Sequence, residues 1–159
     1  MKRQSNCARF GEVVDKKKRP SERPCIVLKS PMFESLKKKH QEEIGALYAK
    51  RKQTVPNESR MILQREINAK VINWNKSHQI EKNYFDLHGM STGGAIWYAS
   101  AIVRAREFTV LRFETGRGNH SKNGIPLIKK ALLERFEQMD RCKVREEPWN
   151  QGVLVVELW

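Results

Sequence analysis

The chain has 159 residues, of which 39% are hydrophobic, so it is long enough for one globular domain with an extension. No apolar run approaches the roughly 20 residues that span a bilayer, and no apolar stretch follows the basic start, which predicts no membrane helix and no secretory signal. The three cysteines, Cys7, Cys25 and Cys142, lie far apart with no CxxC pair. This pattern argues against a disulfide scaffold or a zinc site and favours a reducing, cytoplasmic setting.

The net charge of +13 is unevenly distributed along the chain. Residues 1–85 carry 20 basic and 9 acidic side chains, whereas residues 86–159 carry 11 and 9. Such a skew favours a polyanionic partner, with the N-terminal half attracting phosphates without regard to sequence. The alternative is a solubilising tail followed by a solvated helix face.

The first 82 residues predict a disordered arm and then helices. Residues 1–32 contain "DKKKRPSERP" and show no periodicity, which is typical of a disordered basic arm. Its "KKKR" at 16–19 also has the composition of a nuclear-localisation signal, an alternative to the cytoplasm. Residues 33–82 show two helical periods separated at Pro56, with Ser59 as a candidate cap for the second. We expect an antiparallel hairpin that packs on the following domain.

Residues 83–159 alternate between strand and helix patterns, in the order β-α-β-α-β-β. The strands are expected at 83–88, 109–115, 142–147 and 152–159, and the helices at 92–108 and 124–139, the second with Ile125 on its apolar face. The first three strands alternate apolar and polar residues, such as Phe85 and Leu87 against Asp86 and His88. This predicts a two-layer α/β sandwich whose helices cover one sheet face and leave the other partly open.

Two polar stretches should meet at the carboxyl ends of the first two strands. Asp86 and His88 end "YFDLHG", and "TGRGNHSKNG" follows the next strand. If these strands are parallel neighbours, one cleft holds both stretches. The candidate catalytic residues are Asp86, His88, Arg117 and His120. The candidate phosphate-binding residues are Gly116, Gly118, Asn119, Ser121, Lys122 and Arg112.

These residue types suit RNA cleavage. One imidazole can take the proton of a 2′-hydroxyl and a second, here His120, can protonate the leaving oxygen. An arginine can stabilise the charge that develops on phosphorus, and Asp86 can orient an imidazole. One aspartate and one histidine make a poor magnesium site, so the sequence favours metal-free transesterification without a cofactor, with Mg²⁺ as the alternative. Taken singly, each motif is equally compatible with solvated strand residues or a tight turn.

"FDLHG" followed by "TGRGNHS" resembles the small MutS-related (Smr) domain family, with its L-D-x-H and T-G-x-G motifs. Phe85 stands in place of the motif leucine. The likeness covers residues 83–159 and implies a fold similar to the C-terminal domain of translation initiation factor three. It also implies that Asp86 and His88 are catalytic and that Arg117 contacts the scissile phosphate.

The arginine form of the glycine loop is similar to the eukaryotic branch of that family. The resemblance implies an endonuclease that cuts messenger RNA at stalled ribosomes, as part of mRNA quality control, with RNA and the ribosome as partners and a monomeric chain. Two other hypotheses about function stay open. One is a non-catalytic RNA- or ribosome-binding module, and the other is a nuclease that acts on branched or nicked DNA.

Overall fold

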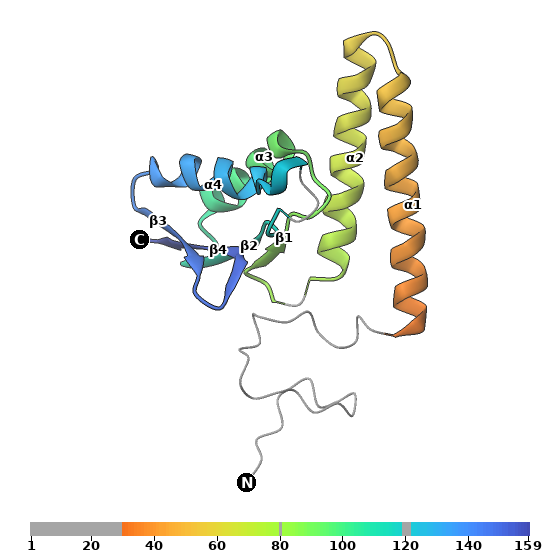
Figure 1. Ribbon diagram of the computed structural model, residues 1–159. Coiled ribbons are helices and arrows are strands. Elements are labelled where there is room, and N and C mark those ends of the chain that lie inside the picture. The colour runs from red at the N-terminus through yellow and green to blue at the C-terminus, as the bar shows by residue number, and fades with distance from the viewer. Residues whose placement is uncertain (1–29, 80, 119–121) are drawn as a thin grey trace.

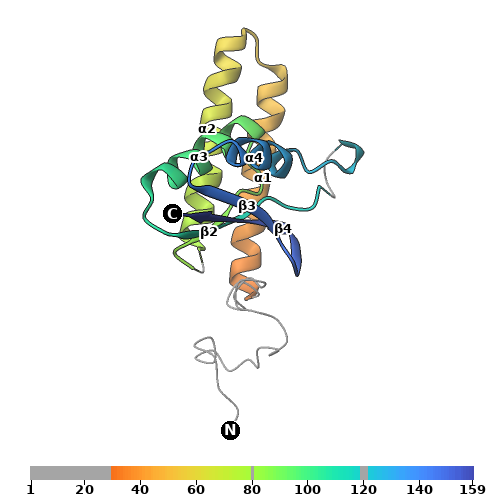
Figure 2. The ribbon, with the colours of Figure 1, turned by 90° about the vertical axis from the view of Figure 1, so that its left-hand side faces the viewer.

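Two long helices stand beside an α/β domain (Figures 1 and 2). The computed structural model describes residues 30–79, 81–118 and 122–159. The predicted disordered arm therefore lies almost wholly outside the described residues. Among the helices that the structure describes, none combines the length and apolar character needed to cross a membrane.

The helices α1 (Pro31–Gln53) and α2 (Asn57–Ser77) form the expected antiparallel hairpin. Helix α1 begins two residues earlier than predicted, because the Ser30 hydroxyl accepts the Phe33 N–H at 3.1 Å and Pro31 fits the first turn. Ser59 does not cap α2, which already begins at Asn57. The hairpin is joined partly by aromatic contacts: the rings of His40 and Trp74 stack with their centroids 4.5 Å apart.

The two helices of the hairpin differ in how deeply they pack. Leu63, Ile67 and Val71 of α2 are buried, and the last two belong to the core of the α/β domain. Helix α1 has no fully buried residue and packs through partly buried side chains such as Ile44 and Leu47. Helix α2 is therefore part of the folded domain, and α1 is a second layer laid over it.

The α/β domain follows the predicted order of elements. They are β1 (Tyr84–Asp86), α3 (Thr92–Ala105), β2 (Val110–Glu114), the short 3₁₀ helix η4 (Lys122–Gly124), α4 (Leu127–Glu137), β3 (Cys142–Glu147) and β4 (Asn150–Leu158). The sheet order is β1-β2-β4-β3. Strands β1 and β2 are parallel, whereas β4 is antiparallel to both β2 and β3. The predicted α/β class and the parallel pairing of the first two strands are thus confirmed.

Helices α3 and α4 cover one face of the sheet (Figure 1). Between them and the sheet lie the side chains that are most completely buried, including Phe113 of β2 and Phe136 of α4, whose ring centroids are 6.0 Å apart. The other sheet face carries the polar positions of β1, β2 and β3, as the alternation predicts. Strand β4 does not show this alternation of apolar and polar residues, because Val153 and Val155 are as buried as Leu154 and Val156.

Two sequence-based boundaries were wrong near the polar loops. Strand β1 ends at Asp86, so His88 lies in the turn after the strand. Helix α4 begins at Leu127, so Ile125 precedes the helix and is 44% exposed instead of facing the core. Both errors fall where the chain leaves regular structure to build the loops described below.

Candidate active site

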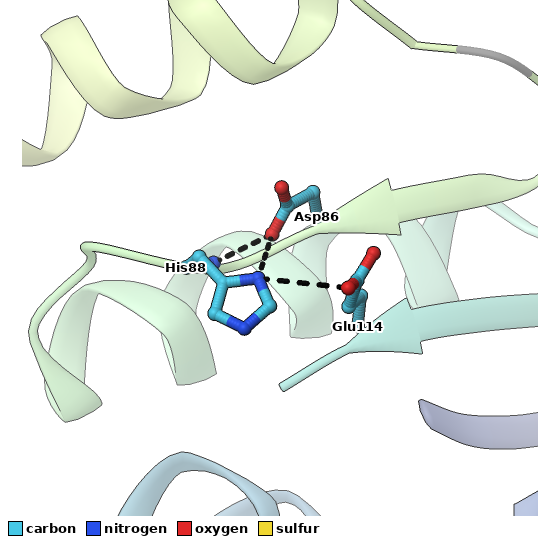
Figure 3. A group of neighbouring side chains, drawn as sticks. All are labelled: Asp86, His88 and Glu114. Carbon is cyan, nitrogen blue, oxygen red and sulfur yellow. Dashed lines mark hydrogen bonds and ion pairs between the residues drawn. The ribbon is translucent and has the colours of Figure 1, made fainter. Parts of the chain in front are cut away.

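Asp86 and His88 form a closely bonded pair at the end of β1 (Figure 3). Asp86 Oδ1 accepts the backbone N–H of His88 at 2.8 Å and lies 2.7 Å from His88 Nδ1. An ionised carboxylate can only accept, so Nδ1 must carry the proton. In the neutral ring Nε2 is then the unprotonated nitrogen, and it points away from Asp86 (Figure 3). This is the tautomer that a general base requires.

The geometry of this pair depends on the turn as well as on the alternation of the strand. Side chains at i and i+2 of an extended strand are about 6.6 Å apart along the strand, too far for a direct hydrogen bond between short side chains. Here the chain bends after Asp86, because its carboxylate accepts the His88 N–H. Leu87 between them stays buried and donates its N–H to Glu114 O at 2.9 Å.

Glu114, the last residue of β2, brings a second carboxylate to the imidazole. Its Oε1 lies 3.8 Å from His88 Nδ1, and its Oε2 accepts the Tyr84 hydroxyl at 2.7 Å. Glu114 pairs with Asp86 in the parallel ladder, which places both side chains on the same sheet face. Glu114 is not among the residues for which the sequence predicts a role. The signal that points to it is the parallel register, because that pairing sets the two carboxylates side by side.

The pKa of His88 is raised above its ordinary value. The largest cause is the hydrogen bond to Asp86, and the charges of Asp86 and Glu114 add to it. Partial burial and the charge of Lys37 on α1 act in the opposite direction. Burial and the nearby charge of Asp86 raise the pKa of Glu114, while the hydrogen bond from Tyr84 opposes that rise. Lys37 thus connects the helical hairpin to the electrostatics of the imidazole.

The glycine loop after β2 passes directly beside Nε2 of His88. Gly116 has φ +78°, and a Cβ at this position would lie 2.8 Å from His88 Nε2. Gly118 has φ +82°, and its Cβ would lie 2.7 Å from Gly124 O and 2.8 Å from Pro126 N. Only glycine combines this backbone conformation with such close approach. The first glycine makes room at the imidazole, and the second lets the loop close against the start of α4.

The two loops line one open groove of about 630 Å³. His88 and Glu114 contribute to it from the ends of β1 and β2, and Arg117 from the glycine loop. Asn150 at the start of β4 lines it as well, with its Oδ1 accepting the Gly152 N–H at 3.1 Å. The predicted meeting of the "DLHG" and "TGRG" stretches is therefore seen in the structure. Asn150 was missed because its approach depends on the pairing of β4 with β2.

The helical hairpin holds the turn after β1. Asn75 of α2 donates its side-chain amide to Asp86 O at 2.8 Å, and Tyr48 of α1 donates its hydroxyl to Gly89 O at 3.2 Å. The Asn68 side chain binds both the backbone N–H and the hydroxyl of Ser91, which caps α3. Both ends of the turn are thus fixed to the hairpin by side-chain hydrogen bonds.

The remaining predicted residues fall into two groups. Arg112 lies on the polar sheet face of β2, where its Nε is 3.4 Å from a carboxylate oxygen of buried Glu147, and it is not among the residues that line the groove. Lys122 begins η4. Asn119, His120 and Ser121 lie outside the described residues. The phosphate-binding roles of Arg112 and Lys122 and the roles of these three residues stay predictions.

Asp86, His88 and Glu114 also have the composition of a cation site. Each offers one ligand atom, and these atoms lie within 4.8 Å of one another. Two carboxylates and an imidazole are donors that suit a divalent cation such as Mg²⁺ or Mn²⁺. Among the described residues the ligand set is therefore larger than the single aspartate and histidine seen in the sequence.

Known proteins were compared with this chain by sequence and by fold. No family model and no curated protein matches the chain. Among solved structures the chain is similar to the solution structure of the B3BP Smr domain, with 25% identity and a TM-score of 0.44. The match covers 65% of this chain and 100% of that one.

Proposed function

We propose that this chain is an RNA endonuclease of the Smr type. The observation that carries the proposal is the state of His88. Its Nδ1 is bonded to Asp86, and its Nε2 faces the Gly116 loop in a groove that also contains Arg117. A neutral imidazole held in this tautomer can act as a general base on a ligand bound in the groove. The motifs "FDLHG" and "TGRGNHS", which resemble those of the Smr family, support the same assignment.

The proposed reaction is a transesterification within the RNA strand. His88 Nε2 accepts the proton of a ribose 2′-hydroxyl, and the 2′-oxygen forms a bond to the adjacent phosphorus. The bond from phosphorus to the 5′-oxygen breaks, and that oxygen takes a proton from a general acid. The products are a 2′,3′-cyclic phosphate and a 5′-hydroxyl. Asp86 stabilises the imidazolium that forms, and this matches the direction in which it shifts the pKa of His88.

Arg117 supplies the positive charge in this mechanism. Its guanidinium can donate two parallel hydrogen bonds to phosphate oxygens and stabilise the charge that builds during the transfer. We retain His120 as the proposed general acid and Asn119, Ser121 and Lys122 as proposed phosphate ligands, because their segment follows directly from the loop that carries Arg117.

The substrate, the partner, the location and the biological process are proposed from the motif resemblance and the charge distribution. The substrate would be messenger RNA, with the ribosome as partner, a monomeric chain, the cytoplasm as location and mRNA quality control as the process. The excess of basic residues in the first 85 residues supports a polyanionic substrate.

A metal-dependent mechanism is the second candidate, and the ligand set of Asp86, His88 and Glu114 favours it. A divalent cation held by these three residues would supply Lewis-acid stabilisation of a phosphate oxygen. We prefer the metal-free route, because Asp86 already holds the imidazole in the tautomer of a base.

The test is a cleavage assay on single-stranded RNA, single-stranded DNA and nicked duplex DNA, each with and without EDTA. We expect cleavage of RNA alone, unchanged by EDTA and lost in His88→Ala. His78→Ala is the matched histidine control, because His78 follows the last residue of α2, where its ring bonds Trp74 O, and it does not line the groove. RNA binding without cleavage would support the binding-module alternative. Cleavage of nicked DNA would support the DNA alternative, and restoration by Mg²⁺ after EDTA would support the metal site.

A further inference from the structure

The groove has an apolar part that the proposed chemistry does not use. Besides the polar residues described above, it is lined by Met90, Pro126, Leu127 and Ile128. Met90 is buried, but Leu127 is 54% exposed, although it is the first residue of α4. Burial of its side chain against a ligand would be favourable, because it removes apolar surface from water. The groove therefore presents an apolar surface that a ligand can cover.

Several other large apolar side chains of this chain are equally exposed, so exposure by itself indicates nothing. Met61 and Ile62 on α2 and Trp97 on α3 are more exposed than Leu127 but do not line the groove. Leu127 differs from them in its position. Pro126, the residue before it, lies against the glycine loop, where a Cβ on Gly118 would be 2.8 Å from Pro126 N. The apolar surface is thus continuous with the loop that carries Arg117.

We infer that the groove binds one unpaired nucleobase beside the scissile phosphate, with Pro126 and Leu127 forming the surface on which the base packs. A nucleotide combines the two chemistries that the groove offers, an anion for Arg117 and a flat apolar face for Leu127. The groove volume of about 630 Å³ lies within the range of small-molecule pockets. This inference deepens the proposed function and rests on it for the position of the phosphate.

Asn150 completes the site with a polar edge. Its Oδ1 accepts the Gly152 N–H, and its side-chain NH₂ is the group that can donate to an acceptor atom on a base. A base can reach this groove only when it has left the stack, because a paired base has its edge occupied and both faces covered. The substrate class is therefore single-stranded RNA, and an RNA duplex should be a poor ligand.

The test measures binding, so it does not depend on cleavage. The probes are a 2′-O-methyl hexauridylate, which has no free 2′-hydroxyl, and a hexamer of abasic sugar phosphates with the same charge. Wild-type protein should bind the hexauridylate about fivefold or more tightly, the lower end of the effect of one stacked base. Leu127→Ala should remove most of this preference and leave the affinity for the abasic hexamer unchanged. Leu127→Met should retain the preference.

Met61→Ala is the matched control, because it removes an exposed apolar side chain outside the groove. It should leave both affinities at the wild-type value. Equal affinity of the wild type for the two hexamers, including no measurable binding of either, would overturn the inference. So would an equal loss of both affinities in Leu127→Ala. If the protein prefers the hexauridylate through Leu127 but never cuts RNA, the nuclease proposal fails and the base site stands.

Discussion

The two loops that meet in the groove are held in different ways. The turn after β1 is bonded to the sheet, where the Leu87 N–H donates to Glu114 O, and also to the hairpin, through Asn75 of α2 and Tyr48 of α1. The glycine loop after β2 is fixed by the sheet itself, because the N–H groups of Thr115 and Gly116 both donate to Gly152 O of β4. The sheet therefore positions the glycine loop, and the hairpin adds side-chain bonds to the turn that carries the imidazole. The helical extension is thus part of the proposed active site.

The largest effect is expected at the point of contact between the two loops. Gly116→Ala would place a Cβ 2.8 Å from His88 Nε2, so we expect RNA cleavage to fall to the background level. Gly124→Ala is the matched control, since Gly124 also has a positive φ, of +67°, but its Cβ would have nothing within 4 Å. Both variants should unfold at similar urea concentrations. Full cleavage by Gly116→Ala would show that cleavage does not depend on the close approach of Gly116 to His88 Nε2.

The next effect concerns the bond from the hairpin to β1. Asn75→Ala removes the donor to Asp86 O, so we expect a loss of about 1 kcal/mol of unfolding free energy and a several-fold lower kcat. Asn83→Ala removes a similar bond, to Val110 O at 3.0 Å, at the opposite end of β1. Urea titrations should give similar losses for both, while only Asn75→Ala slows cleavage. Equal kcat values for the two variants would show that the bond from Asn75 of the hairpin to Asp86 O does not affect catalysis.

A smaller effect is expected in the pH dependence of the rate. His88 must lose its proton to act as a base, so the rate should fall on the acid side as pH drops through its raised pKa. Glu114→Gln removes a charge that raises this pKa, and the acid limb should move to lower pH. Lys37→Gln removes a charge that lowers it, and the limb should move to higher pH. Shifts in the same direction would contradict the assignment of the limb to His88.

The smallest effect is expected from α1. The Tyr48 hydroxyl bonds Gly89 O at 3.2 Å in an exposed position, so Tyr48→Phe should cost less than about 1 kcal/mol of unfolding free energy. The kcat for RNA should fall by less than in Asn75→Ala, because Gly89 is farther along the chain from Asp86. A larger loss in Tyr48→Phe would mean that α1, and not α2, sets the position of the turn.

The sequence predicted the parts of this molecule that depend on local periodicity. Alternation in β1, β2 and β3 gave the polar face, and the two motifs gave the meeting of His88 with the glycine loop. It did not predict the roles of Glu114, Asn150 and Lys37, because each depends on pairing between elements that lie far apart in the chain. The sequence also did not predict the bend after Asp86. There the Asp86 carboxylate accepts the His88 N–H, which would otherwise be available to continue the strand.

The most direct test of the proposed mechanism is the chemistry of the cleaved ends. A single-stranded RNA should be cut in EDTA to give a 2′,3′-cyclic phosphate and a 5′-hydroxyl. The same RNA with one 2′-deoxy sugar at the scissile position should not be cut there, because the nucleophile is missing. Products with 5′-phosphate ends, formed only when Mg²⁺ or Mn²⁺ is present and also from the 2′-deoxy substrate, would contradict His88 as the base. They would assign Asp86, His88 and Glu114 to a metal ion instead.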